Sequence, residues 1–114
     1  ADAFVFVTPE YNHSYNAALK NAIDYLSQEW GHKPVGFVSY GGVAGGARAV
    51  GGLRPVLAVL KMVPITEGVT MQAFTQYFDD EGRFQPTDRL EENLAEMFAS
   101  LERWIGALST LRSA

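Results

Sequence analysis

The sequence contains no cysteine and only two histidines, and these gaps exclude several kinds of chemistry. Without cysteine there is no disulfide framework, no thiolate-bound zinc or iron–sulfur centre, and no thiol nucleophile. No metal ligand follows His13 or His32 by three or four residues, and the spacing of Glu10 and His13 means little on a loop, so we expect no metal centre. No serine lies in a nucleophile motif, and no Asp–His relay is evident, so we expect no catalytic side chain.

The charge balance and the short apolar runs are also restrictive. The formal net charge is −4, which argues against nucleic acid as the main partner because such binding depends on neutralising phosphates. The longest apolar runs, residues 3–7 and 56–60, are far shorter than the roughly 20 residues that cross a bilayer. No secretory signal pattern opens the chain, so a cytoplasmic location is expected, without membrane contact.

What the sequence does contain fits one globular domain of alternating strands and helices. Of its 114 residues, 47% are apolar, enough for one core and too few residues for two domains. Residues 3–7 are continuously apolar, which is typical of a strand covered on both faces, and residues 35–38 form a second apolar run. Residues 62–71 predict a third extended stretch, bent around Glu67 and Gly68.

Helical spacing separates these strands. A first helix is predicted from Ala17 through Leu26, capped by Asn16 or Ser14 and followed by a left-handed Gly31. A second is kinked by an internal proline, and a third begins with a capping box and carries a long apolar stripe. The residues that carry these two predictions are Val50, Leu53, Pro55, Leu57 and Leu60, then Asp88, Glu91, Leu90, Leu94, Met97, Leu101, Ile105 and Leu108. The resulting βαβαβα order predicts an α/β fold with a doubly wound parallel sheet and right-handed crossovers.

Two loops follow consecutive predicted strands and form the candidate site. In open parallel sheets, ligands bind at the carboxyl ends of the strands. Residues 8–14 and 39–48 both combine tyrosine with residues that expose backbone donors, which suits a flat aromatic ligand. Residues 41–46 match neither the P-loop nor the dinucleotide fingerprint. Two interpretations of this glycine-rich stretch stay open: its amides and Arg48 bind an anion, or a tight turn simply needs glycine.

Other conspicuous side chains have simpler interpretations. The three acids at 79–81 are expected to be solvated on a surface turn, and His32 to lie on a solvated loop. Trp30 and Trp104 are expected in a core or an interface. The remaining aromatics near the third strand are expected to pack over a sheet edge; they are Phe74, Tyr77, Phe78 and Phe84.

Six short segments together resemble the NADPH-dependent FMN reductases, flavodoxin-like proteins that include quinone, azo-dye and chromate reductases. The resemblance rests mainly on Pro-Glu-Tyr-Asn at 9–12 combined with Ser-Tyr-Gly-Gly at 39–42. Supporting segments are residues 19–24, 33–35, 46–49 and 53–57.

The resemblance implies a five-stranded parallel sheet in the order 2-1-3-4-5, with the three predicted strands as strands 3 to 5. The first two strands and the phosphate-gripping loop would precede residue 1, so residues 1–114 are expected to be the carboxyl-terminal part of one such domain. It further implies FMN as cofactor, NADPH or NADH as hydride donor, and a flavin, quinone or similar small-molecule acceptor. The implied FMN contacts are Pro9, Glu10, Tyr11, Asn12, Ser39, Tyr40, Gly41 and Gly42.

The resemblance also implies a homodimer or homotetramer, with the helices that start near Ala17 and Ala47 packed between subunits. Two alternatives stay open. One is a non-catalytic half-domain that acts only in self-association, and the other is an electron-transfer flavodoxin without a pyridine-nucleotide step.

Overall fold

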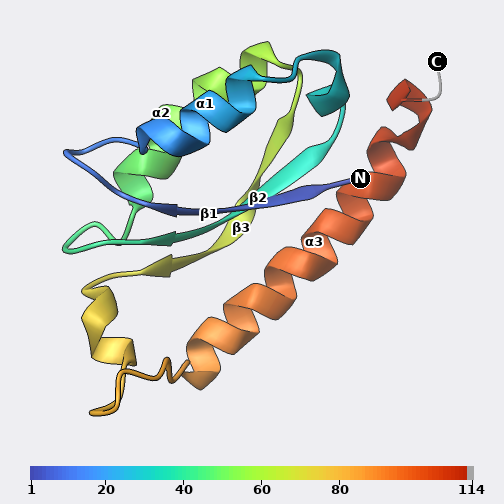
Figure 1. Cartoon of the computed structure of the whole chain (residues 1–114). Coiled ribbons are helices and arrows are strands. Elements are labelled where there is room, and N and C mark those ends of the chain that lie inside the picture. Colours follow the sequence, from blue (N-terminus) through green and yellow to red (C-terminus); the bar gives the residue numbers. More distant parts are fainter. Residues whose placement is uncertain (113–114) are drawn as a thin grey trace.

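The computed structural model describes residues 1–112 and shows a parallel sheet between two helical layers. Helices α1 and α2 cover one face of the sheet, and α3 crosses the other (Figure 1). The elements are β1 (Phe4–Pro9), α1 (Ala17–Asp24), η1 (Gln28–Trp30), β2 (Pro34–Tyr40), α2 (Ala47–Val59), β3 (Val63–Met71), η2 (Phe74–Tyr77) and α3 (Asp88–Arg112). The predicted α/β order with parallel strands is therefore confirmed. None of these helices is both long and apolar enough to cross a membrane.

The strand register brings the three carboxyl ends to one edge of the sheet. The order is β1-β2-β3, and Tyr40 of β2 is paired with Pro9 of β1 and with Met71 of β3. The three arrowheads in Figure 1 consequently lie together, and the loops that leave them are neighbours in space. We call this side of the sheet the carboxyl edge.

The larger core cluster lies between the sheet and the pair α1 and α2. Trp30 is buried in it, with its indole N–H donating to the Ile23 carbonyl at 3.0 Å and its ring edge-on to Phe4 at 4.8 Å. The predicted core position of Trp30 is confirmed, whereas Trp104 on α3 is 40% exposed. The cluster contains Phe6, Ile23, Trp30, Val35, Phe37, Leu53, Leu57 and Met62.

The opposite face of the sheet is covered by α3 through the predicted apolar stripe. Met97 and Leu101 are buried against Ile65, and α3 comes so close to β2 that a Cβ on Gly36 would lie 2.7 Å from the Met97 sulfur. The expected cap at Asp88 is wrong, because the Leu90 N–H donates to the Thr87 hydroxyl at 3.2 Å. Asp88 instead lies in the first turn, where the helix dipole favours a negative charge.

Three local predictions about the first strand and helix are corrected. Residues 3–7 are not covered on both faces, since α3 packs on β2 and β3 and leaves Val7 63% exposed. Helix α1 ends at Asp24, so Leu26 lies beyond it, although Asn16 caps its start as predicted, accepting from the Leu19 N–H at 2.8 Å. Gly31 has an ordinary φ of −59°, and the left-handed conformation falls on His32 instead.

The predicted bend in the third strand is a β-bulge. Val35 pairs with Pro64 and Phe37 with Gly68, so two steps along β2 correspond to four along β3. Gly68 fits because a Cβ there would lie 2.9 Å from the Phe37 carbonyl oxygen. Pro55 lies within α2 as predicted.

Candidate functional site

The two loops predicted to form the site lie side by side at the carboxyl edge. The first loop, residues 10–16, is joined to β2 by a hydrogen bond from the Glu10 N–H to the Tyr40 carbonyl at 3.2 Å. The second loop, residues 41–46, begins with the Gly41 N–H donating to the Met71 carbonyl at 3.2 Å. The predicted residues Pro9 to Asn12 and Ser39 to Gly42 are thus brought together by the register of the sheet.

The first loop is a tight hairpin that projects Tyr11. The N–H groups of Tyr11 and Ser14 donate to each other's carbonyls at 2.9 and 3.0 Å, with Asn12 and His13 between them at φ of 49° and 68°. Two consecutive left-handed residues are the signature of a type I′ turn, and asparagine adopts that conformation at little cost. The Tyr11 side chain is 60% exposed at this turn.

Ser39, near the end of β2, supports the second loop. Its hydroxyl is 1% exposed and donates to the Gly45 carbonyl at 2.9 Å, so this side chain supports the turn rather than facing a ligand. Gly46 has φ of 90°, and a Cβ there would lie 2.5 Å from the Ser39 Cβ. Gly42 is different, since a Cβ would meet nothing within 4 Å and the loop is open to approach there.

The Glu10 carboxylate lies beside Arg48, where one interpretation of the glycine-rich stretch placed an external anion. Its carboxylate accepts from the Arg48 backbone N–H at 2.9 Å and from Arg48 Nε at 2.7 Å, at the first turn of α2. Burial raises the pKa of Glu10, but the hydrogen bonds from Arg48 outweigh it and hold the pKa below its ordinary value. Because a side chain of this chain caps α2, the structure favours the interpretation of the glycines as a backbone requirement.

Arg48 also contacts His13 on the first loop. Its Nη1 lies 2.9 Å from His13 Nε2, so one guanidinium bridges two residues of that loop. All three side chains lie in the predicted loops, but no local pattern links them, because Arg48 is 38 residues from Glu10. We call this linked set, Glu10, Arg48 and His13, the brace.

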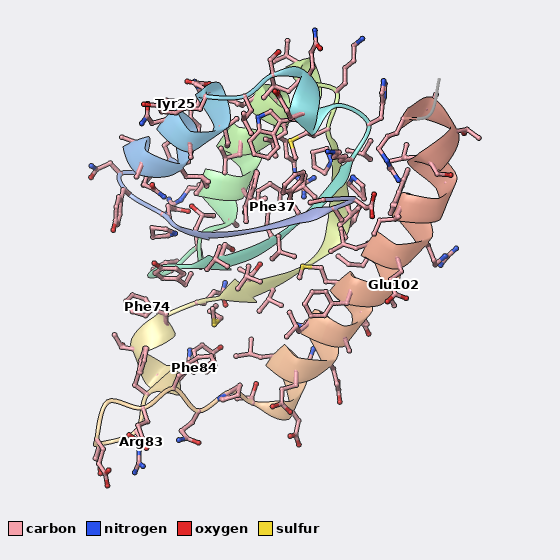
Figure 2. The ribbon with its side chains drawn as sticks, turned by 45° about the vertical axis from the view of Figure 1, so that its right-hand side comes forward. Tyr25, Phe37, Phe74, Arg83, Phe84 and Glu102 are labelled. Atoms are coloured by element: carbon pink, nitrogen blue, oxygen red, sulfur yellow. The ribbon has the colours of Figure 1, made fainter. Side chains whose placement is uncertain are left out.

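A third segment, which sequence analysis assigned only to packing, completes the carboxyl edge. The N–H groups of Ala73 and Phe74 donate to the carbonyls of Gly42 and Gly41 at 2.7 and 3.2 Å, and the Phe74 ring stands edge-on to Tyr40 at 5.4 Å. Figure 2 shows Phe74 and Phe84 on the segment after β3. They help to enclose a mostly apolar cavity of about 440 Å³, the aromatic hollow, lined by Val7, Tyr40, Met71, Phe74, Phe78 and Phe84.

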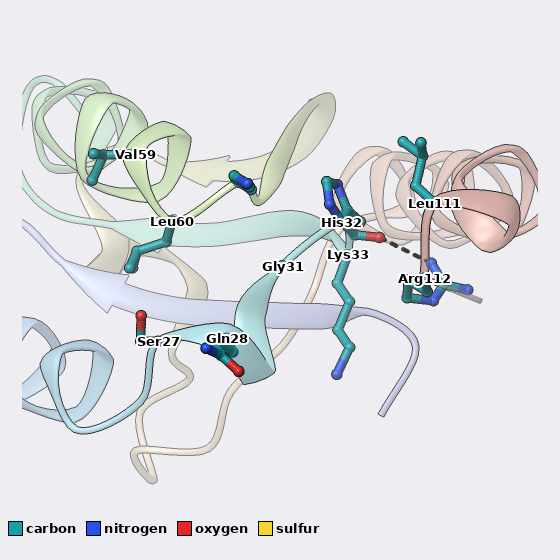
Figure 3. Close-up of a pocket in the computed structure, with 10 residues that line it drawn as sticks. Ser27, Gln28, Gly31, His32, Lys33, Val59, Leu60, Leu111 and Arg112 are labelled. Carbon is teal, nitrogen blue, oxygen red and sulfur yellow. Dashed lines mark hydrogen bonds between the residues drawn. The ribbon is translucent and has the colours of Figure 1, made fainter. Parts of the chain in front are cut away.

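A second cavity, of about 660 Å³, lies at the opposite edge of the sheet, near the start of β2 (Figure 3). Arg112 closes one side by donating from Nη1 to the His32 carbonyl at 3.0 Å. His32 therefore lies at the edge of the sheet where the strands begin, away from both predicted loops. The cavity is lined by Ser27, Gln28, Gly31, His32, Lys33, Val59, Leu60, Lys61, Leu111 and Arg112.

Comparison with known proteins places these features in one family. A family model described as NADPH-dependent FMN reductase matches residues 1–76. An NAD(P)H-dependent FMN reductase of Schizosaccharomyces pombe is 44% identical over 99 residues, covering 85% of this chain and 48% of that protein. An NADPH:quinone oxidoreductase of Arabidopsis thaliana is 37% identical over 108 residues, covering 90% of this chain and 55% of that protein.

Among solved structures, the flavoenzyme NAD(P)H:(acceptor) oxidoreductase FerB from Paracoccus denitrificans superposes with a TM-score of 0.63 at 24% identity. That match covers 96% of this chain and 62% of FerB, and at this identity it shows a shared fold. The chain spans about half the length of the two curated relatives described above.

Proposed function

Because this chain belongs to the NADPH-dependent FMN reductase family, we propose that it carries the ring-binding loops of an FMN-dependent oxidoreductase. The reaction takes hydride from NADPH or NADH and passes electrons to a flavin, a quinone or a similar small acceptor. The observation that carries this proposal is the adjacency of the first and second loops, fixed by the hydrogen bond from Glu10 to Tyr40. We also propose that β1, β2 and β3 correspond to strands 3 to 5 of a flavodoxin-like sheet, with residues 1–114 forming part of that one domain.

The residues at the carboxyl edge fit the ring of FMN. A flat aromatic ring needs an apolar surface, aromatic neighbours and backbone groups for its polar edge. The aromatic hollow beside Tyr40 provides the first two, and the open backbone at Gly42 provides access to the third. We assign Pro9, Tyr11, Asn12, Tyr40, Gly41 and Gly42 to direct contact, with Glu10 and Ser39 holding the loops in place.

When bound, FMN supplies the capacity to accept hydride and to release electrons, which protein side chains lack. The chain's own residues would therefore bind and orient the ring rather than donate or accept a proton. The half-buried Tyr40, held between the sheet and Phe74, gives the ring a fixed neighbour. A ring bound against the apolar lining of the aromatic hollow would be shielded from water on that side.

We propose that the protein is a homodimer or homotetramer built through α1 and α2. These helices cover one face of the sheet, and a large exposed apolar side chain stands at the carboxyl end of each. Val59 and Tyr25, which follows α1 directly, are each 80% exposed, and Figure 2 shows Tyr25 on the outside of the molecule. Burial of such side chains is a driving force for association.

The test is a titration of the purified protein with FMN, followed by NADPH or NADH without oxygen. We expect quenching of flavin fluorescence on binding and bleaching of the yellow colour by the nucleotide. Tyr40→Leu should weaken FMN binding about tenfold, a loss of ~1.4 kcal/mol, whereas Tyr40→Phe, which keeps the ring, should bind nearly as the parent does. A protein that takes up no FMN would overturn the proposal in favour of the self-association module. FMN uptake without reduction by either nucleotide would favour the electron-transfer flavodoxin.

A further inference from the structure

We propose that the brace positions Tyr11 and Asn12 for contact with the flavin ring, so that Arg48 serves the site without touching the cofactor. This inference rests on the proposed function for its purpose. Its geometry is independent of any cofactor, because the Glu10–Arg48 and Arg48–His13 contacts exist within the chain itself.

The brace links the two loops through a rigid group. Arg48 lies in the first turn of α2, directly after the second loop, while Glu10 and His13 both belong to the first loop. A guanidinium is planar and presents its N–H groups in a fixed fork, so two simultaneous bonds fix its orientation. The strand register brings the two loops together, and this one side chain fixes the first loop against the start of α2.

The residues that the brace positions lie between its two contacts with the first loop. Tyr11 and Asn12 are the residues enclosed by Glu10 and His13, and both are exposed. Little packing supports these two side chains. The turn also contains two left-handed residues that have to be stabilised by their surroundings. The hydrogen bonds between Tyr11 and Ser14 close the turn, and the brace ties the His13 side of that closed turn to the start of α2.

The charges of the brace make Arg48 a positioning residue rather than an anion receptor. A guanidinium only donates, so the facing nitrogen of His13 must accept, and Glu10 balances the positive charge. The Arg48 side chain is 44% exposed, but that of Glu10 is only 8% exposed, so the pair is partly buried. Arg48→Ala would leave the Glu10 carboxylate with its bond from the residue 48 backbone N–H, so we expect a modest loss of unfolding free energy beside the change in loop order and FMN affinity.

Four variants separate this role from a general effect of charge or stability. Arg48→Ala removes the link, while Arg48→Lys keeps the charge but cannot hold both partners in a planar fork. Glu10→Gln keeps an acceptor for the Arg48 backbone N–H but presents an amide donor where Nε needs an acceptor. Arg103→Ala, which alters an exposed arginine on α3, is the matched control.

Three measurements are made on each variant: FMN affinity by flavin fluorescence, hydrogen exchange at the Tyr11 and Ser14 amides, and the melting temperature. We expect about tenfold weaker FMN binding for both Arg48 variants, an intermediate loss for Glu10→Gln, and no change for Arg103→Ala. In the absence of FMN, hydrogen exchange at the two amides should be faster in the Arg48 and Glu10 variants than in the parent protein. The melting temperature should fall by no more than a few degrees, because the Glu10 carboxylate keeps its bond from the residue 48 backbone N–H in the Arg48 variants.

The outcomes distinguish the brace from the proposed function. If the parent protein binds no FMN, the function fails, and the exchange rates still decide whether the brace orders the turn. If the parent binds FMN while Arg48→Ala binds it equally well with unchanged exchange, the brace is wrong. Full affinity in Arg48→Lys together with loss in Arg48→Ala would also overturn it, since the charge alone would then suffice.

Discussion

Pro9 at the end of β1 lies directly opposite Tyr40 at the end of β2, and the next N–H along the chain, that of Glu10, donates to the Tyr40 carbonyl at 3.2 Å. Two loops that are about 30 residues apart in sequence thus leave the sheet from neighbouring points. Parallel pairing makes this unavoidable, because the carboxyl ends of adjacent parallel strands share one edge. The site is therefore a consequence of strand register, and changes that disturb the register or its supports should disturb the site.

Replacing Gly46 by alanine should destabilise the protein by about 2–3 kcal/mol. Its φ of 90° disfavours any side chain, and the new Cβ would lie 2.5 Å from the Ser39 Cβ. Gly51→Ala is the control, since Gly51 lies within α2 with open space around it and should gain up to ~1 kcal/mol. Urea unfolding measures both, and equal free energies of unfolding for the two variants would contradict this account.

Phe74→Ala should weaken FMN binding about fivefold while changing the unfolding midpoint little. Phe74 is 36% exposed, yet its ring is edge-on to Tyr40 and it forms one wall of the aromatic hollow. The control is Phe98→Ala, because Phe98 is 49% exposed on α3, away from the hollow. Fluorescence titration with FMN compares the two, and parallel losses would indicate that Phe74 has no special position.

Trp30→Phe should cost about 1–3 kcal/mol of stability, because it removes a buried hydrogen bond to the Ile23 carbonyl and leaves a small cavity. Trp104→Phe changes the same residue type at a position that is 40% exposed and should be nearly neutral. Thermal unfolding followed by circular dichroism gives the comparison. A Trp104→Phe variant as unstable as Trp30→Phe would show that the assigned core is wrong.

Asp79 should make the protein less stable in acid. The Arg83 backbone N–H donates to its carboxylate at 2.9 Å and, with a further bond from the Glu81 N–H, holds the pKa of Asp79 below its ordinary value of 3.8. A lowered folded-state pKa stabilises the fold above pH 3.8, and that contribution disappears as the pH falls further through the folded-state pKa.

Asp79→Asn should therefore be less stable than the parent at neutral pH, and the difference should shrink at a pH of about 2.5. Asp80→Asn, which makes the same change at the exposed neighbouring position, is the matched control. Urea midpoints at the two pH values provide the measurement. A difference that stays constant across this range would show that the Asp79 bonds are not retained in solution.

Much of the fold follows from hydrophobic spacing, because long apolar stripes have few alternative partners. The stripe from Leu90 to Leu108 predicted α3 correctly, and the continuous apolar runs predicted parallel strands. Errors arose where neighbouring residues have equal propensity. Thr87 and Asp88 are both good caps, and only the hydrogen bond to Leu90 distinguishes them. Leu26 fits the helical period, but α1 ends earlier, and Trp30 packs against its last turn.

The candidate site shows the same division between local and distant information. The two loops could be predicted because each carries its own residues in one short segment. The link between Glu10 and Arg48 could not, because it joins side chains 38 residues apart and no local pattern records it. Phe74 was missed for a related reason, since an aromatic residue after a strand is compatible with packing anywhere along the sheet edge.

The bulge in β3 has a consequence for how molecules of this protein meet one another. β3 is the outer strand on its side of the described sheet, and an even outer strand would invite a strand of another molecule to pair with it. The two extra residues interrupt the regular spacing of N–H and carbonyl groups along β3, and Pro64 has no N–H to donate. Glu67, held by the Ser100 hydroxyl at 2.7 Å, adds a charge beside the bulge. This border should therefore resist the addition of a strand from another molecule.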